Sequence, residues 1–197
     1  MAAEPETSAS SYPGNGNYPI PIDLFISKNH PQVTRGDLAF ADSEGNIVYR
    51  VNRRRCPTSS PDNKKLLLDA NSNPLLSIYH DQKGSWKCYK GDSNDDKDLV
   101  FKVNRTVKTL TRIELEVFLA GERSEESPCQ LKVRGLPFQK SCNIYNDNEL
   151  VAQTSLMYKL NQIFVGRGKF RLTILFPVSI DHSLLAALVV IFLNGRK

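Results

Sequence analysis

The sequence lacks the patterns by which common enzyme classes are recognised. It contains no G-x-S-x-G elbow, no Walker A motif and no H-E-x-x-H zinc motif, and its three histidines are scattered, at positions 30, 80 and 182. Its four cysteines, at 56, 88, 129 and 142, form no C-x-x-C pair, so we expect reduced structural thiols. We therefore predict no catalytic residue, no metal site and no cofactor.

Long hydrophobic runs are also absent, apart from the ten apolar residues Leu184–Leu193. At about 1.5 Å per residue, a helix from His182 to Leu193 is roughly 18 Å long, well short of the ~30 Å hydrocarbon layer of a bilayer. An apolar helix of this length must be covered on every side by the protein itself. We predict a core helix with the side chains Leu184, Leu185, Leu188, Val189, Ile191 and Phe192, capped by Asp181 or Ser183 at its start and Gly195 at its end. A buried central strand is the alternative, because the run includes β-branched residues.

The first nineteen residues contain no Val, Leu or Ile, and they include three prolines and two glycines. Such a segment cannot offset the entropy lost on ordering, so we expect residues 1–19 to be a disordered tail and residues 20–197 to form one domain. Residues 1–10 contain no Lys or Arg and no apolar stretch, unlike a secretory signal or a transit peptide. We expect a cytoplasmic monomer, with peripheral membrane and nuclear locations left open.

From Ile22 onward, short apolar stretches alternate with turn residues about every eight to twelve positions, a pattern typical of all-β sandwiches and barrels. Two hairpins resemble each other: Asp42 and Asn46 frame the first turn, and Asp69 and Asn73 frame the second, 27 positions later. Other segments alternate apolar and polar residues, so each has one dry and one wet face. About twelve such strands predict a mainly β protein, a closed antiparallel barrel around the C-terminal helix.

Positive charge is concentrated in one part of the chain. Residues 50–112 carry fourteen basic and seven acidic side chains, a balance of +7 in a protein of net charge +5. The residues predicted to contact anionic lipid or phosphate are Arg53, Arg54, Arg55, Lys87 and Lys90. A solvated surface that keeps the protein in solution is the alternative interpretation.

The predicted domain also carries an ordered set of short segments. They are IDL at 22–24 with Lys28, GD at 36–37, DSEGNIVYRV at 42–51, LLDA at 67–70, NPLL at 73–76, Trp86 with YKGD at 89–92, FKV at 101–103, VFL at 117–119, Val133 with Gly135, SCNIY at 141–145, VAQ at 151–153, and Phe170 to Pro177 followed by Asp181 and LLAALVVI at 184–191. In this order they resemble the plant LURP-one-related family. Two positions depart from the usual pattern: DHSL at 181–184 replaces Asp-Tyr-Ala-Phe, and Ser72 stands where a glycine is usual.

The resemblance implies a tubby-like barrel of about twelve strands around a hydrophobic helix, related to tubby C-terminal domains and phospholipid scramblases. It implies a non-enzymatic protein in a family of which some members are linked to plant defence. Since tubby domains bind phosphoinositides, we expect a module that binds anionic membrane lipid. Membrane-tethered, transcription-factor-like association with nucleic acid, a protein-interaction scaffold and scramblase-like activity remain alternatives. No nucleic-acid recognition motif accompanies the arginine cluster.

Overall fold

The computed structural model describes residues 20–28, 30–34, 36–53, 64–81, 84–109, 111–120, 130–157, 169–175 and 180–194. Their secondary structure consists of β1 (Ile22–Ser27), β2 (Leu38–Ala41), β3 (Ile47–Arg53), β4 (Lys65–Asp69), β5 (Pro74–His80), β6 (Ser85–Lys90), a 3-10 turn η1 (Asp96–Asp98), β7 (Leu99–Lys108), β8 (Ile113–Leu119), β9 (Leu131–Leu136), β10 (Ser141–Asn146), β11 (Glu149–Leu156), β12 (Lys169–Ile174) and α1 (His182–Asn194). The predicted tail, residues 1–19, lies outside the described residues.

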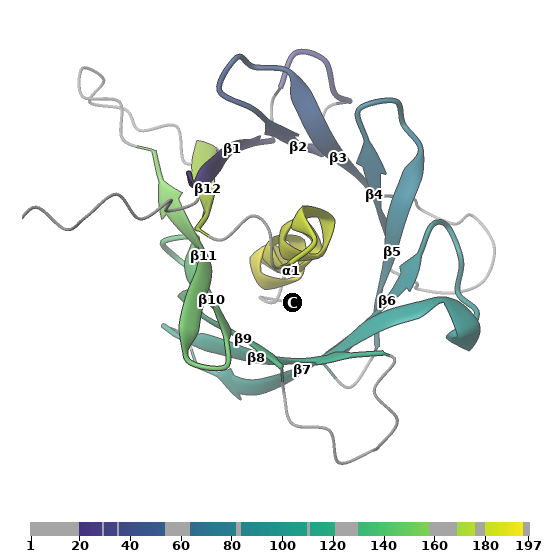
Figure 1. Ribbon diagram of the computed structural model, residues 1–197, viewed down its shortest axis with the longest axis vertical. Coiled ribbons are helices and arrows are strands. Elements are labelled where there is room, and N and C mark those ends of the chain that lie inside the picture. The colour runs from purple at the N-terminus through teal and green to yellow at the C-terminus, as the bar shows by residue number, and fades with distance from the viewer. Residues whose placement is uncertain are drawn as a thin grey trace, which may run out of the picture.

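The twelve strands form a closed barrel in which every strand pairs with its neighbours in sequence. The first and last strands close the ring, since β1 pairs antiparallel with β12 from Ile22 opposite Ile174 to Ser27 opposite Lys169. Figure 1 looks through this ring, with α1 at its centre. The predicted fold, a closed antiparallel barrel around a C-terminal helix, is confirmed.

Alternating side chains explain why the strands close around a dry interior. In β8, Ile113, Leu115 and Val117 are at most 2% exposed, whereas the glutamates between them lie on the outer face. The described cysteines follow the same rule: Cys88 and Cys142 are buried free thiols. Burial raises the pKa of the Cys142 thiol to about 12, so it is protonated at neutral pH.

Helix α1 fills the barrel. All ten residues from Ser183 to Phe192 are buried, including the six side chains predicted for the core. The Asp181 carboxylate caps the start, because its Oδ1 accepts a hydrogen bond of 2.8 Å from the backbone N–H of Ser183. The segment is therefore a helix and the alternative of a central strand is wrong. Gly195, the predicted end, lies outside the described residues, and no helix in the described part of the chain is long and apolar enough to cross a membrane.

Candidate functional site at the barrel mouth

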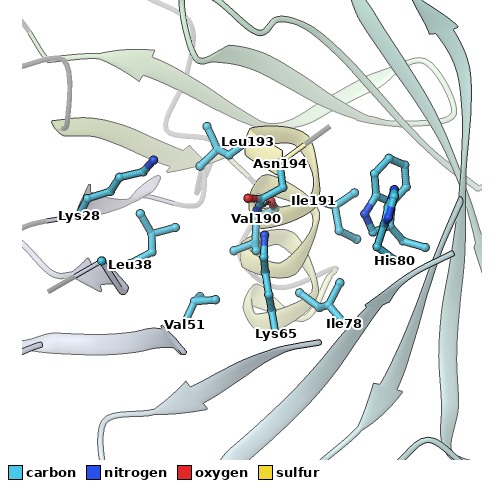
Figure 2. Close-up of a pocket in the computed structure, with 12 residues that line it drawn as sticks. Lys28, Leu38, Val51, Lys65, Ile78, His80, Val190, Ile191, Leu193 and Asn194 are labelled. Atoms are coloured by element: carbon cyan, nitrogen blue, oxygen red, sulfur yellow. Dashed lines mark hydrogen bonds between the residues drawn. The ribbon is translucent and has the colours of Figure 1, made fainter. Parts of the chain in front are cut away.

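A cavity of about 300 Å³ lies at the end of the barrel where α1 ends, which we call the mouth. Figure 2 shows the last turns of α1 near the centre of the view, with Lys28 and Leu38 to the left and Ile78 and His80 to the right. The lining residues are Leu38, Val51, Ile78, Trp86, Val190, Ile191 and Leu193, which are apolar, Gly36, and the polar residues Lys28, Lys65, His80 and Asn194. The site is thus an apolar pocket with a few polar groups, as ligand pockets commonly are.

The antiparallel register brings the polar residues together. Lys65 begins β4 opposite Ile78 of β5, and His80 ends β5 opposite Trp86 of β6. Because neighbouring strands run in opposite directions, the start of β4, the end of β5 and the start of β6 meet at the mouth. Residues separated by more than twenty positions therefore share one cavity.

The polar part of the lining is positive. Lys28 and Lys65 line the cavity, and among the lining residues that the structure describes there is no carboxylate. In Figure 2, Lys65 extends toward the last turn of α1. The C-terminal end of a helix is the negative end of its dipole and stabilises cations placed there. An ammonium group has three donors, so a lysine that contacts the helix end retains donors for an anion.

Aromatic side chains pack next to the positive charges of the lining. The His80 and Trp86 rings have centroids 4.9 Å apart, and the Arg105 guanidinium lies 5.7 Å from the centroid of the Trp86 ring. The pKa of His80 is lowered by burial and by the positive charges of Arg105 and Lys65, against the opposing effect of Asp81. His80 is therefore neutral at pH 7 and has one donor and one acceptor nitrogen.

A glycine makes room for this arginine. A Cβ atom on Gly84 would lie 2.7 Å from a terminal nitrogen of Arg105, and the φ angle of Gly84 is +77°. Both the backbone conformation and the space thus favour glycine at this position.

The structure separates the basic residues that the sequence singled out. Arg53 ends β3 opposite Lys65, at the mouth, but its side chain and the residues Arg54 and Arg55 lie outside the described part. Lys87 lies on the outer face of β6, where Tyr79 and Lys102 are its cross-strand neighbours. Lys90 is exposed at the far end of the same strand, opposite Leu76. A shared lipid contact by these five residues stays a prediction.

The sequence analysis assigned no binding role to the residues that line the cavity. Lys28, Lys65, His80 and Trp86 carry no motif and are scattered along the chain. The alternation in β6 was a usable signal, because it places Trp86 and Cys88 on the inner face of the barrel. His80 is paired with Trp86 across the antiparallel strands, so it lies next to this face. Finding it required the register of β4 to β6, which no local pattern provides.

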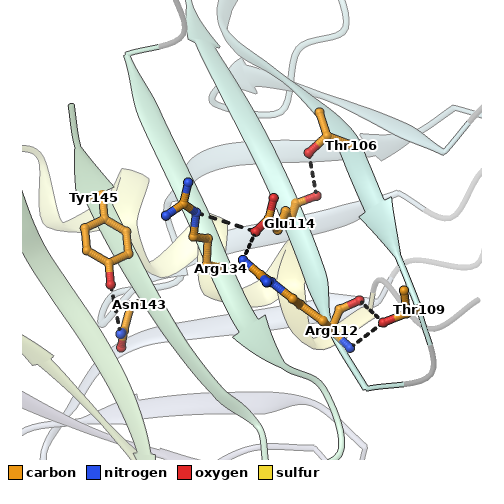
Figure 3. A network of polar contacts seen from close by, with 7 residues as sticks. All are labelled: Thr106, Thr109, Arg112, Glu114, Arg134, Asn143 and Tyr145. Carbon is orange, nitrogen blue, oxygen red and sulfur yellow. Dashed lines mark hydrogen bonds and ion pairs between the residues drawn. The ribbon is translucent and has the colours of Figure 1, made fainter. Parts of the chain in front are cut away.

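A second basic group, on the outer face of β8 to β10, is already neutralised in part. The Glu114 carboxylate forms ion pairs with Arg112 and with Arg134, the latter at 3.6 Å (Figure 3). The Arg134 guanidinium also lies 5.9 Å from the centroid of the Tyr145 ring. Because one carboxylate offsets one of the two guanidinium charges, this group has a smaller net positive charge than the two lysines of the cavity.

Comparison with known proteins identifies similar sequences in one plant family. The sequence model of the LURP-one-related family matches residues 22–193. The protein LURP-one-related 7 of Arabidopsis thaliana is 52% identical to this chain over 176 residues, which are 89% of this chain and 91% of that protein. LURP-one-related 10 of the same plant is 30% identical over 88% of this chain and 89% of its own length.

A solved structure has the same architecture. An X-ray structure of a protein from Arabidopsis thaliana superposes with a TM-score of 0.63 and 26% sequence identity, over 90% of this chain and 91% of that one. The match therefore includes most of the barrel and is not limited to a few strands.

Proposed function

The chain belongs to the LURP-one-related family of plant proteins, and on that premise we propose that it is a non-catalytic module that binds an anionic phospholipid head group in the cavity at the mouth. The observation that carries the proposal is the presence of two lysines and an apolar wall in one cavity of about 300 Å³. The positive charges of Lys28 and Lys65 are suited to binding a phosphate. The apolar side chains of Leu38 and Val51 are suited to contact the glycerol and the first methylene groups.

The cavity size favours a head group over a whole lipid. Ligand pockets commonly span roughly 300–1,000 Å³, so this cavity is at the small end of the range. A head group fits such a volume and its acyl chains stay outside. Neutral His80 supplies a donor and an acceptor for hydroxyl groups of the head group, and Arg105 behind Trp86 adds to the positive potential.

Nucleic-acid association is less well supported by the geometry. Proteins that read the major groove usually present a helix to it, and α1 has its whole middle section buried inside the barrel. Scramblase-like activity by insertion of α1 would require the same buried side chains to leave the core. By analogy with family members linked to plant defence, we place head-group binding in defence-related signalling.

Calorimetric titration with water-soluble short-chain phosphatidylserine and phosphatidylinositol phosphate tests the proposal. Lys65→Ala should weaken binding by about tenfold or more, since a charge-assisted hydrogen bond contributes about 1.5–3 kcal/mol and each 1.4 kcal/mol is tenfold. The matched control is Lys87→Ala, which removes the same charge from the outer face of the same sheet. Lys87→Ala should bind as the wild type does.

Two results would contradict the proposal. If Lys87→Ala or Lys90→Ala loses binding while Lys65→Ala retains it, the lipid site is on the outer surface. If the wild-type protein binds neither lipid, the cavity is not a phospholipid site. Melting temperatures of all variants show whether a loss of binding is due to unfolding.

A further inference from the structure

Large apolar side chains are exposed at the mouth. The described residues with exposed large apolar side chains are Ile20 (84%), Leu136 (40%), Phe138 (65%) and Met157 (38%). Leu136 ends β9, Phe138 lies in the turn that follows, and Met157 comes directly after β11. In a closed antiparallel barrel the ends of β9 and β11 lie at the same end as the start of β4, where Lys65 lines the cavity. Ile20 precedes β1 and is at the opposite end.

The turn that carries Phe138 is well ordered by hydrogen bonds. The backbone N–H of Gln139 donates to the carbonyl of Leu136 at 3.1 Å, and that of Lys140 donates to the carbonyl of Pro137 at 3.3 Å. At its base, the hydroxyl of the buried Thr154 donates to the carbonyl of Lys140 at 3.0 Å. The exposed Phe138 ring is therefore attached to an ordered backbone. Less conformational entropy is lost when such a side chain becomes buried in a binding interface.

Basic side chains surround the apolar group at the same end of the barrel. They are Lys28, Lys65, Arg105, Lys108, Lys140 and Lys169. The acidic residues at this end of the described structure include Asp37, Asp81 and Glu114. Glu114 is paired with arginines, and Lys64, which precedes β4, is paired with Asp92 at 2.6 Å. Lys and Arg side chains are attracted to an anionic membrane surface, and aromatic and aliphatic side chains favour the interface below the head groups.

We propose that the barrel docks end-on to anionic bilayers, with Leu136, Phe138 and Met157 in the membrane interface and the basic mouth against the head groups. This inference rests on the proposed function and gives it an orientation: the cavity at the mouth opens toward the surface from which a head group enters. The occupant of the surface is a bilayer because exposed apolar side chains and a surplus of positive charge occur together on one end of the molecule.

Co-sedimentation of the full-length protein with phosphatidylcholine vesicles, with and without phosphatidylserine, tests the docking surface. The double variant Leu136→Ser, Phe138→Ser should bind the phosphatidylserine vesicles about tenfold more weakly or worse, because it loses the burial of two large apolar side chains. Its affinity for short-chain phosphatidylserine should be unchanged. Ile20→Ser is the matched control, an equally drastic change at the opposite end, and should bind vesicles as the wild type does.

The outcomes separate the two proposals. If the double variant binds vesicles as well as the wild type, or if the wild type binds short-chain lipid but no vesicle, the docking surface is wrong and the head-group site stands. If the surface bound a protein partner instead of a bilayer, the double variant would likewise bind vesicles as well as the wild type, and the docking proposal would be wrong. If the double variant loses vesicle binding, and neither the wild type nor the variant binds short-chain lipid, the docking surface stands and the head-group site in the cavity is wrong.

Discussion

Two Asp–Asn pairs close similar hairpins at the end of the barrel opposite the mouth. The Asp69 carboxylate accepts hydrogen bonds from the backbone N–H of Asn73 at 2.8 Å and from its side-chain amide at 2.9 Å, and Asp42 holds Asn46 in the same way. The sequence predicted both turns, because side-chain and backbone hydrogen bonding by Asp and Asn is local. The turns differ at one position: Gly45 has φ +90°, and the corresponding Ser72 has φ 71°.

Substitution of Gly45 should destabilise the protein, whereas substitution of Ser72 by glycine should not. Gly45→Ala should lower the free energy of unfolding by about 1–2 kcal/mol through backbone strain alone. A Cβ atom at Gly45 would meet nothing within 4 Å, so no steric clash contributes. Ser72→Gly relieves strain and should leave stability unchanged or raise it by up to about 1 kcal/mol. Urea unfolding measures both, and equal destabilisation by the two changes would contradict the prediction.

Asp69 should make stability depend on pH in the acid range. Its pKa lies below the ordinary 3.8, chiefly because of the side-chain and backbone hydrogen bonds from Asn73. The ionised carboxylate therefore stabilises the fold fully above the pKa of the unfolded chain, and this contribution is lost as the pH falls through the lower pKa of the folded state. Melting temperatures of the wild type and Asp69→Asn should differ by a constant amount above pH 3.8 and converge below it. A difference that stays constant down to pH 2 would contradict this account.

At the scale of elements, the fit between α1 and the barrel wall decides the fold. The sequence predicted from its composition that Leu184–Leu193 is a buried helix, and it kept a buried strand as the alternative because the run includes β-branched residues. The structure shows one place where the wall makes room for the helix: β9 has Gly135 next to the Phe192 ring of α1. A Cβ atom there would lie 2.6 Å from Cζ of Phe192 and 2.5 Å from the carbonyl oxygen of Ser141.

Gly135→Ala should therefore overpack the contact between β9 and α1. We expect a loss of about 1–3 kcal/mol in the free energy of unfolding, the usual cost of an added methyl group in a packed core. Adding Phe192→Leu to this variant should recover part of the loss, since it removes the ring that the new methyl group meets. Denaturant titrations of the single and double variants measure this, and a wild-type value for Gly135→Ala alone would mean that the helix does not pack tightly here.

Leu188→Asp should abolish folding. Leu188 is 0% exposed at the centre of α1, and a carboxylate there would have to be buried without a partner. Ile20→Asp is the control, because Ile20 is 84% exposed and tolerates a charge. Circular dichroism melts should show a cooperative transition for the control only. A cooperative melt of Leu188→Asp would mean that α1 is not the core of the barrel.

At the scale of the whole molecule, charge is distributed along the barrel axis. In the described structure, Lys28, Lys65 and Arg105 lie at the mouth, where α1 ends, whereas Asp42, Asp69 and Asp181 lie at the end where α1 begins. This arrangement complements the helix dipole at both ends. The sequence analysis could count the positive charge in residues 50–112 and name a cluster, but it could not assign the charges to an end or a face. That assignment depends on register and closure, which bring Lys28, after β1, and Lys65, at the start of β4, to the same cavity.

The fluorescence of Trp86 tests the central claim, that an anionic head group binds in the cavity at the mouth. Trp86 is the one tryptophan of the chain and lines this cavity, so its emission reports on the site directly. Titration with short-chain phosphatidylserine should give a saturable change that weakens as salt is raised, and short-chain phosphatidylcholine should give a much smaller one. Calorimetric binding of phosphatidylserine with no change in Trp86 emission would contradict the claim and place the ligand elsewhere on the protein.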